Sequence, residues 1–264
     1  VYKRQFEDND FKSGKLANSS PLKIIRDGNF LVLHMKDGVI GHVHTGSSQY
    51  DGDKIIEKIS AMGVIPVVAI ENAADACGLG DALIEGGLPC AEITFRTAAA
   101  PSAIRTLCNS HPGILVGAGT VLTKLDAEIA VDAVASFVVT PGFDGGLVDW
   151  CLDQSIPVIP GVMTPTDINA AINRKLNILK FFPAEAAGGI KTLKAISGPY
   201  GSIKFVPTGG ITLGNLEDYL SLPNVVACGG SWLVKKDQIS SGEFDTIETL
   251  VREAVQLVDH IRGK

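Results

Sequence analysis

The sequence has no long apolar run. A membrane-spanning helix needs roughly 18 apolar residues in a row, and the longest apolar stretch here, residues 64–70, has the length of a strand and contains Pro66. The chain also lacks an excess of basic residues, since its formal net charge is -6 and its sequence pI is about 5.4. Because nucleic-acid-binding proteins usually carry a basic face, we expect neither a membrane nor a nucleic acid as a partner.

Patterned cysteine is missing as well. The five cysteines form no Cys-x-x-Cys pair and are scattered through apolar stretches, which is typical of small core residues in a reducing compartment. The first residues carry charges but no apolar segment of the kind found in secretory signal peptides. We therefore expect a cytoplasmic protein.

The first 50 residues differ in composition from the rest of the chain. They are rich in Ser, Gly, Asn and Asp, and residues 29–44 have the pattern of a short hairpin with Asp37 and Gly38 in its turn. We predict an N-terminal extension over residues 1–50, flexible or weakly folded, and a single domain over residues 51–264.

Beyond residue 50, runs typical of β-strands alternate with segments typical of helices. This alternation predicts right-handed βαβ units and a parallel sheet. Eight such runs in one domain predict a (β/α)8 TIM barrel, and a doubly wound open sheet, which normally has fewer strands, is the alternative. The runs cover residues 64–70, 90–95, 114–119, 136–142, 156–161, 177–182, 203–210 and 225–230.

A barrel of this class carries its chemistry at the carboxyl ends of its strands. Alternation along a strand sends successive side chains to opposite faces. In the second run, Glu92 and Thr94 alternate with Ile93, and in the sixth run Lys180 alternates with Leu179. If the apolar residues face the helices, then the carboxylate, the hydroxyl and the amine point into the barrel.

Paired glycines follow the last two runs. Gly209 and Gly210 end the seventh, and Gly229 and Gly230 end the eighth, just before Ser231. Glycine lets backbone N–H groups approach an anion closely, and the following helix adds a favourable dipole. Since the loops after strands 7 and 8 form a recurring phosphate site in TIM barrels, we predict that these loops bind a phosphate.

Lys180 lies among large apolar residues, in the stretch ILKFF. One explanation for a lysine in this stretch is that its aliphatic stem lies along apolar surface while the ammonium group remains in water. The other is catalytic: burial disfavours the ammonium form, and a neutral amine adds to carbonyls and forms Schiff bases. With Glu92 on the same inner face for proton transfer, the pattern favours carbon–carbon chemistry on a phosphorylated keto substrate.

At these residues the sequence resembles the class I (Schiff-base) aldolases of 2-keto-3-deoxy-6-phosphogluconate (KDPG) and 4-hydroxy-2-oxoglutarate (KHG). The resemblance extends over roughly residues 60–262 and leaves residues 1–50 uncovered. It implies reversible cleavage of KDPG to pyruvate and glyceraldehyde 3-phosphate in the Entner–Doudoroff pathway, with KHG as a further candidate substrate, without a cofactor, by a homotrimer. The stretches that carry it are GGLPCAEITFRT, GAGTVL, FVVTPGF, IPGVMTPT, LKFFPAEAAGGIKTLKAISGP, FVPTGGI and GGSWLV.

The resemblance also implies a role for each site residue. Lys180 forms the Schiff base with the C2 keto group, and Glu92 is the general acid and base, acting through a water. Thr208 lies near C4 of the substrate. The residues around the carboxylate and keto end are Arg96, Thr120, Thr164 and Phe182, and those that hold the phosphate are Gly209, Gly210, Gly230 and Ser231.

Ligands for a catalytic metal are scarce. Beyond residue 50 the only histidines are His111 and His260, and neither follows a predicted strand, so we expect no metal site and place both at the surface. Glu185, after the sixth run, is expected to interact with backbone N–H groups at a helix start.

Three other functions remain open from the sequence. A galactonate-series aldolase differs only in the stereocentre it accepts at C4. A phosphosugar isomerase or epimerase would use Glu92 as a base without a covalent step. A non-enzymatic binder of phosphorylated ligands is less favoured, because it has no use for an inward-facing Lys180 and Glu92.

Overall fold

A computed structural model describes residues 4–5, 21–27, 30–35, 40–44 and 52–263. The chain divides into two compact units, Val1–Asp51 and Gly52–Lys264. In the first unit, β1 (Arg4–Gln5), β2 (Pro21–Asp27), β3 (Phe30–Met35) and β4 (Ile40–His44) form one sheet in the order β1-β4-β3-β2. Strands β3 and β4 are antiparallel, as the hairpin pattern predicts, while the predicted turn at Asp37 and Gly38 lies outside the described residues.

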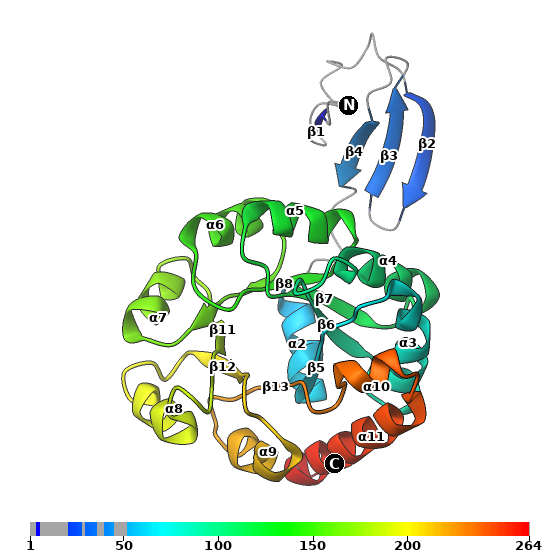
Figure 1. Cartoon of the computed structure of the whole chain (residues 1–264). Helices are drawn as coiled ribbons and strands as arrows, with labels where there is room; N and C mark the ends of the chain where they lie inside the picture. The colour runs from blue at the N-terminus through cyan, green and yellow to red at the C-terminus, as the bar shows by residue number, and fades with distance from the viewer. Residues whose placement is uncertain (1–3, 6–20, 28–29, 36–39, 45–51, 264) are drawn as a thin grey trace. The chain divides into compact units, whose positions relative to one another are not determined.

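The second unit alternates strands and helices along most of its described length (Figure 1). Its first half contains α2 (Gly52–Met62), β5 (Val64–Val68), η1 (Ala73–Asp75), α3 (Ala76–Glu85), β6 (Cys90–Thr94), α4 (Ala100–Ser110), β7 (Leu115–Gly119), α5 (Lys124–Asp132), β8 (Phe137–Val139) and α6 (Gly145–Asp153). Its second half contains β9 (Val158–Ile159), β10 (Gly161–Val162), α7 (Pro165–Ile172), β11 (Ile178–Phe181), α8 (Gly189–Ser197), β12 (Lys204–Pro207), α9 (Leu213–Leu220), β13 (Cys228–Gly230), α10 (Lys236–Ser240) and α11 (Phe244–Arg262).

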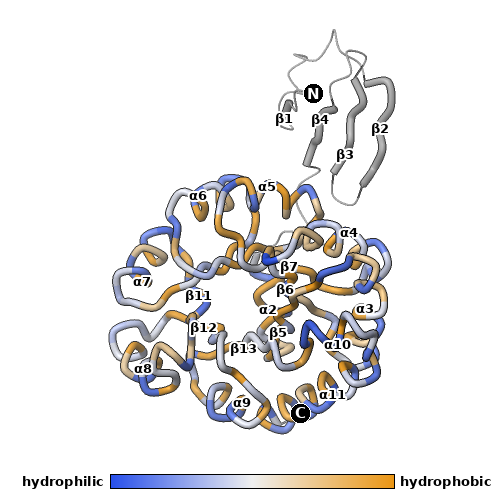
Figure 2. The backbone as a smooth tube through the Cα atoms, viewed as in Figure 1, coloured by the Kyte–Doolittle hydropathy of each residue, from blue (hydrophilic) through white to orange (hydrophobic). Residues whose placement is uncertain are grey.

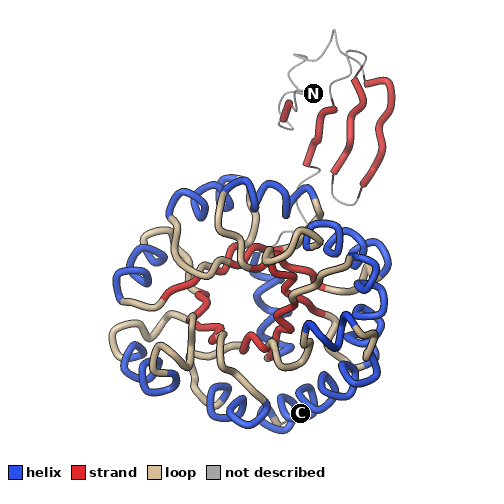
Figure 3. Tube along the Cα trace, viewed as in Figure 1, coloured by secondary structure: helices blue, strands red, loops and turns tan. Residues whose placement is uncertain are grey.

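The strands of this unit are parallel and pair in two sheets, in the orders β13-β5-β6-β7-β8-β9 and β10-β11-β12. Figure 3 shows an inner ring of strands with helices around it, while α2, labelled in Figure 1, is seen in the middle of the ring. Each of the eight predicted runs contains a strand, and the fifth is divided into β9 and β10 at Pro160, which has no N–H to donate. The pairing thus establishes an α/β unit with a curled parallel sheet, in segments of six and three strands.

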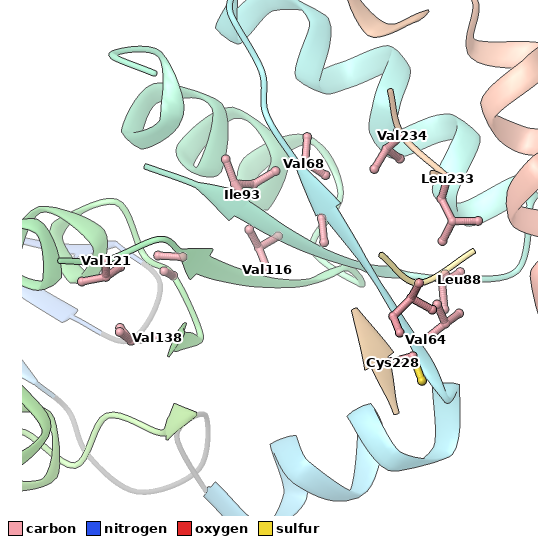
Figure 4. Close-up of a cluster of buried hydrophobic side chains, with 14 of the residues drawn as sticks. Val64, Val68, Leu88, Ile93, Val116, Val121, Val138, Cys228, Leu233 and Val234 are labelled. Atoms are coloured by element: carbon pink, nitrogen blue, oxygen red, sulfur yellow. The ribbon is translucent and has the colours of Figure 1, made fainter. Parts of the chain in front are cut away.

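One hydrophobic cluster lies between the sheet and the helices. It includes Ile93, Val116, Leu179 and Phe181, and Figure 2 shows β5, β6 and β7 as predominantly hydrophobic. Figure 4 shows part of this cluster, with side chains of neighbouring strands side by side. The alternation that assigns Leu179 to the helix layer is therefore correct, and Phe181, two residues on, lies in the same layer.

A second cluster covers the inner face of the sheet at its amino end. Ile55 and Ile59 of α2 pack there against side chains from the starts of the strands, among them Cys90, Leu115 and Ile178. Because inner-face positions recur every second residue, the next inner residues along β6 and β11 are Glu92 and Lys180. Apolar packing against α2 thus fills the amino end and leaves the polar residues nearer the carboxyl end.

Among the described residues, none of the helices is both long enough and apolar enough to span a membrane.

Candidate active site

Lys180 of β11 and Glu92 of β6 meet on the inner face of the sheet. The Nζ atom of Lys180 donates a hydrogen bond to Oε1 of Glu92 at 3.0 Å. Their side chains are only 5% and 2% exposed, so the two opposite charges lie out of water and neutralise each other. This contact confirms that both side chains point inward, and it places an amine and a carboxylate within direct proton-transfer distance.

A glycine on the neighbouring strand makes room for the Glu92 side chain. Gly117 and Gly119 of β7 lie opposite Glu92 and Thr94 in the strand register. A Cβ atom on Gly119 would lie 2.2 Å from Oε1 of Glu92, which is far inside van der Waals contact. The carboxylate can therefore occupy its position only because residue 119 has no side chain.

An aromatic ring lies close to the amine. The Nζ atom of Lys180 lies 5.6 Å from the centroid of the Phe182 ring, a distance at which the face of the ring attracts a cation. Phe182 is half-buried and comes two residues after Lys180, at the end of β11. The structure thus brings this predicted wall residue to the lysine.

Two threonine hydroxyls tie the strand ends together. The hydroxyl of Thr94 donates to the carbonyl of Val68 at 2.7 Å, which joins β6 to β5. Thr140, which precedes Pro141 in the fourth predicted run, is not among the site residues that the sequence predicts. Its buried hydroxyl donates to the carbonyl of Gly142 at 2.6 Å and accepts from the N–H of Gly161 at 3.2 Å.

Arg96 and Thr120 meet where β6 and β7 end. The guanidinium Nε of Arg96 donates to the Thr120 hydroxyl at 3.3 Å, and Arg96 is exposed. Thr120 has a φ of +53°, a left-handed conformation that is strained for a β-branched residue. Strain of this kind gathers at ligand-binding sites, and the pair offers a cation and a hydroxyl to an anion.

The two glycine loops lie side by side. Thr208 forms a parallel bridge with Gly229, and a Cβ on Gly229 would lie 2.3 Å from the Thr208 hydroxyl oxygen. Gly209 and Gly210 have φ angles of +100° and +81°, which residues other than glycine rarely adopt. The bridge brings the ends of β12 and β13 together, as the predicted phosphate site requires.

In these loops the backbone carbonyl groups accept hydrogen bonds, whereas several backbone N–H groups have no acceptor in the described part of the chain. The carbonyl of Gly209 accepts from the N–H of Glu185 at 3.0 Å, and that of Gly210 accepts from Nδ2 of Asn215 at 3.1 Å. Within the described ranges, the N–H groups of Gly209, Gly210 and Ser231 donate to no protein acceptor. Free amides at the ends of adjacent strands are suited to an anion.

The comparisons with known proteins agree with this geometry. The family model described as "KDPG and KHG aldolase" matches residues 55–250. The chain belongs to this aldolase family. It is therefore a carbon–carbon lyase, as its resemblance to the family implied.

Relatives of the aldolase match it over nearly their whole length. It is 47% identical over 209 residues to the 2-dehydro-3-deoxy-phosphogluconate aldolase of Haemophilus influenzae, covering 79% of this chain and 99% of that one. It is 41% identical over 193 residues to the KHG/KDPG aldolase of Escherichia coli K12, covering 73% and 91%.

A solved structure matches as well. The KDPG aldolase of Legionella pneumophila, with pyruvate captured as a covalent carbinolamine intermediate, has a TM-score of 0.74 and 41% identity, covering 76% of this chain and 97% of that one. A KDPGal structure, at 22% identity and a TM-score of 0.69, shares the fold.

In this aldolase the hydroxyl of Thr164 is already occupied. It donates to Oδ2 of Asp167 at 2.9 Å and accepts from the N–H of Asp167 at 3.3 Å, which caps the start of α7. Thr123 caps α5 with Asp126: its hydroxyl accepts from the N–H of Asp126 and its own N–H donates to the Asp126 carboxylate. The sequence pattern Thr-x-x-Asp signals such a cap, and it could have been recognised at residues 164–167.

Two other sequence expectations, on His111 and Glu185, need correction. His111 is not a surface residue: its side chain is 10% exposed, and its Nε2 atom lies 2.9 Å from Oδ1 of Asp81. It fits there because Gly80 has no side chain to occupy the space. The carboxylate of Glu185 accepts a hydrogen bond from the hydroxyl of Tyr219 rather than from backbone amides at a helix start.

Proposed function

We propose that this aldolase forms a Schiff base through Lys180 and reversibly cleaves KDPG to pyruvate and glyceraldehyde 3-phosphate. The buried contact of 3.0 Å between Lys180 and Glu92 carries the proposal, because it unites a nucleophile and a proton carrier out of water. The substrate follows from the curated relatives, which are named for it, and the covalent step from the pyruvate carbinolamine of the Legionella relative.

In the first stage the ammonium group of Lys180 gives a proton to Oε1 of Glu92, its hydrogen-bond partner, and the neutral amine adds to the C2 keto carbon. Glu92 passes that proton to the keto oxygen and then accepts a second proton from Nζ, which gives the neutral carbinolamine. Glu92 then returns a proton to the C2 hydroxyl, which leaves as water while the C2=N double bond of the iminium forms.

In the second stage Glu92 accepts the proton of the C4 hydroxyl. The C3–C4 bond breaks, its electron pair moves into the iminium to give an enamine, and C4 becomes the aldehyde carbon of glyceraldehyde 3-phosphate. Protonation at C3 and addition of water to C2 then release pyruvate and regenerate Lys180. No step requires a metal ion or an organic cofactor.

The carboxylate end of the substrate is assigned to Arg96 and Thr120. Arg96 supplies a positive charge, and its bond to the strained Thr120 keeps the two side chains together at the strand ends. Phe182 forms the wall beside the amine. Thr164 keeps the start of α7 in place as its cap, and we assign no substrate oxygen to its hydroxyl.

The phosphate end is assigned to the two glycine loops. The free N–H groups of Gly209, Gly210 and Ser231, together with Gly230, form a neutral cradle for its oxygens. Thr208, beside them, is placed near C4 of the substrate. This arrangement follows the phosphate sites after strands 7 and 8 of TIM barrels.

The proposal extends to the architecture and assembly. Residues 51–264 form a closed (β/α)8 barrel, supported by the bridges from Phe205 to Val225 and from Thr208 to Gly229 between the two sheets, and residues 1–50 form a separate extension. A homotrimer is supported by apolar side chains at α5, where Leu122 and Leu125 are 61% and 63% exposed. Five free thiols support a cytoplasmic enzyme of the Entner–Doudoroff pathway.

Reductive trapping tests the covalent step. Borohydride added with pyruvate is expected to inactivate the enzyme and to leave a stable adduct on Lys180, which peptide mass spectrometry locates. Lys180→Met should give no adduct. An unmodified wild-type lysine would contradict the proposal and favour an isomerase or epimerase in which Glu92 acts alone. A coupled pyruvate assay with KDPG, its galactonate epimer and KHG then ranks the substrates.

A further inference from the structure

Glu185 lies in the loop between β11 and α8 and belongs to no step of the proposed reaction. Its Oε1 atom accepts a hydrogen bond from the hydroxyl of Tyr219 of α9. Tyr219 is fully buried, and burial, together with the bond to Glu185, raises the pKa of its phenol. The hydroxyl therefore keeps its proton and remains a donor to the carboxylate.

The Glu185 side chain packs against two glycines. A Cβ atom on Gly210 would lie 2.5 Å from Cγ of Glu185. On Gly189, at the start of α8, a Cβ atom would lie 2.9 Å from Oε1 of Glu185 and 2.8 Å from the Tyr219 hydroxyl oxygen. Both glycines have positive φ angles, +81° and +54°, so the carboxylate side chain fits only against backbone of this shape.

The backbone around Glu185 holds the same loop. The N–H of Ala184 donates to the carbonyl of Thr208 at 2.8 Å, and the N–H of Glu185 donates to the carbonyl of Gly209 at 3.0 Å. Main chain and side chain of residue 185 therefore both contact the segment from Thr208 to Gly210, whose glycine amides are free. Tyr219 is the group that fixes the direction of the side chain.

We propose that Glu185 and Tyr219 are a positioning pair that orients the amides of Gly209 and Gly210 and thereby sets the affinity of the aldolase for the phosphate end of its substrate. The proposal rests on the phosphate site of the proposed function. The bond to Tyr219 also restrains a negative charge that would repel a phosphate if the side chain were free to turn toward it.

Three variants and one control test the pair. Glu185→Ala and Tyr219→Phe remove the hydrogen bond, whereas Glu185→Gln keeps an acceptor for Tyr219 and removes only the charge. Glu217→Ala, an exposed position on the same helix as Tyr219, is the control. Two quantities are measured: the KM for KDPG, and the pyruvate concentration that half-saturates borohydride inactivation, which reports on the amine without a phosphate.

Glu185→Ala and Tyr219→Phe are expected to raise the KM for KDPG about tenfold, because each removes a hydrogen bond to a charged group. The pyruvate concentration that half-saturates borohydride inactivation should stay within twofold of wild type. Glu185→Gln and Glu217→Ala should keep the wild-type KM. An unchanged KM in the first two variants, or an equal rise in both quantities, would overturn the pair's role. Failure of pyruvate trapping in the wild type would instead refute the Schiff-base function itself.

Discussion

At the scale of single residues, the site depends on two buried charges and on the space that surrounds them. Removing Lys180 or Glu92 alone would leave an unpaired charge in the interior, a change that destabilises proteins by roughly 3–5 kcal/mol. The glycine at position 119 offers a gentler way to disturb the pair, because the atoms nearest to a methyl group there all belong to the Glu92 side chain.

Gly119→Ala is expected to lower kcat about a hundredfold. The added methyl group displaces Oε1 of Glu92, and a displacement of about 1 Å in a catalytic group can cost that much. Gly113→Ala is the matched control, because a Cβ atom at that position would have no neighbour within 4 Å and the φ of Gly113 is not left-handed. Steady-state kinetics of pyruvate release measure both variants, and a kcat within twofold of wild type for Gly119→Ala would contradict the geometry.

Buried thiols give the enzyme a pH-dependent stability. Burial raises the pKa of Cys151 from 9.0 to about 12. Below pH 9 the thiol is neutral in both the folded and the unfolded chain, so its full contribution to the free energy of unfolding is present. Between about pH 9 and 12 only the unfolded chain ionises, so the free energy of unfolding falls as the pH rises.

Cys151→Ala removes one of the thiols whose ionisation in the unfolded chain lowers the free energy of unfolding at alkaline pH. Urea unfolding between pH 8 and 11 is expected to show the same slope against pH as the wild type below pH 9, and a slope that is smaller by up to about 1.4 kcal/mol per pH unit above it. Val148→Ala, another buried residue of α6, lowers stability equally at every pH and serves as the control. Identical slopes for Cys151→Ala and wild type would show that this thiol ionises alike in both states.

At the scale of elements, the strands were more predictable than the loops. Alternation correctly assigned Leu179 outward and Lys180 inward, because in a sheet covered by helices the side-chain period of two leaves each residue one of two faces. Loop hydroxyls have no such restriction. The hydroxyl of Thr164 bonds within the start of its own helix, whereas that of Thr140 accepts from the N–H of Gly161, 21 residues away. No local sequence pattern specifies the second contact.

Thr164→Ala and Thr123→Ala compare two equivalent helix caps. Each loses a hydroxyl that accepts from the third residue of its helix, so each should lower the free energy of unfolding by about 1 kcal/mol. Since the Thr164 hydroxyl is occupied by Asp167, the KM for KDPG should agree within twofold between the variants. Denaturant melts and initial rates test this, and a KM that rises only in Thr164→Ala would restore its predicted contact with the substrate.

At the scale of the whole molecule, every predicted site residue lies in the unit Gly52–Lys264. The barrel prediction places Glu92 and Lys180 on the same inner face although they lie 88 positions apart in the sequence, but it does not specify that they touch. His111 was misplaced for a related reason, since its partner Asp81 and the space at Gly80 come from another helix. Contacts between distant elements depend on packing that composition and period do not encode.

A variant that begins at Gly52 is expected to keep the full activity. The family model starts at residue 55, and 209 residues of this chain cover 99% of the Haemophilus relative. We expect the kcat, the KM for KDPG and the rate of borohydride inactivation with pyruvate all to lie within twofold of the full chain. A loss of activity in a truncated protein that retains its circular dichroism would assign residues 1–51 a part in catalysis.

Helix α2 fills the amino end of the inner face, and this imposes an order on the products. Lys180 pairs with Val206 in the strand register, and Gly209 follows further toward the carboxyl end, so the proposed phosphate site lies further from α2 than the amine does. With the phosphate held there, we expect glyceraldehyde 3-phosphate to depart before pyruvate. In the direction of synthesis, we expect an aldehyde phosphate that arrives first to block the route to the lysine and to inhibit condensation in competition with pyruvate.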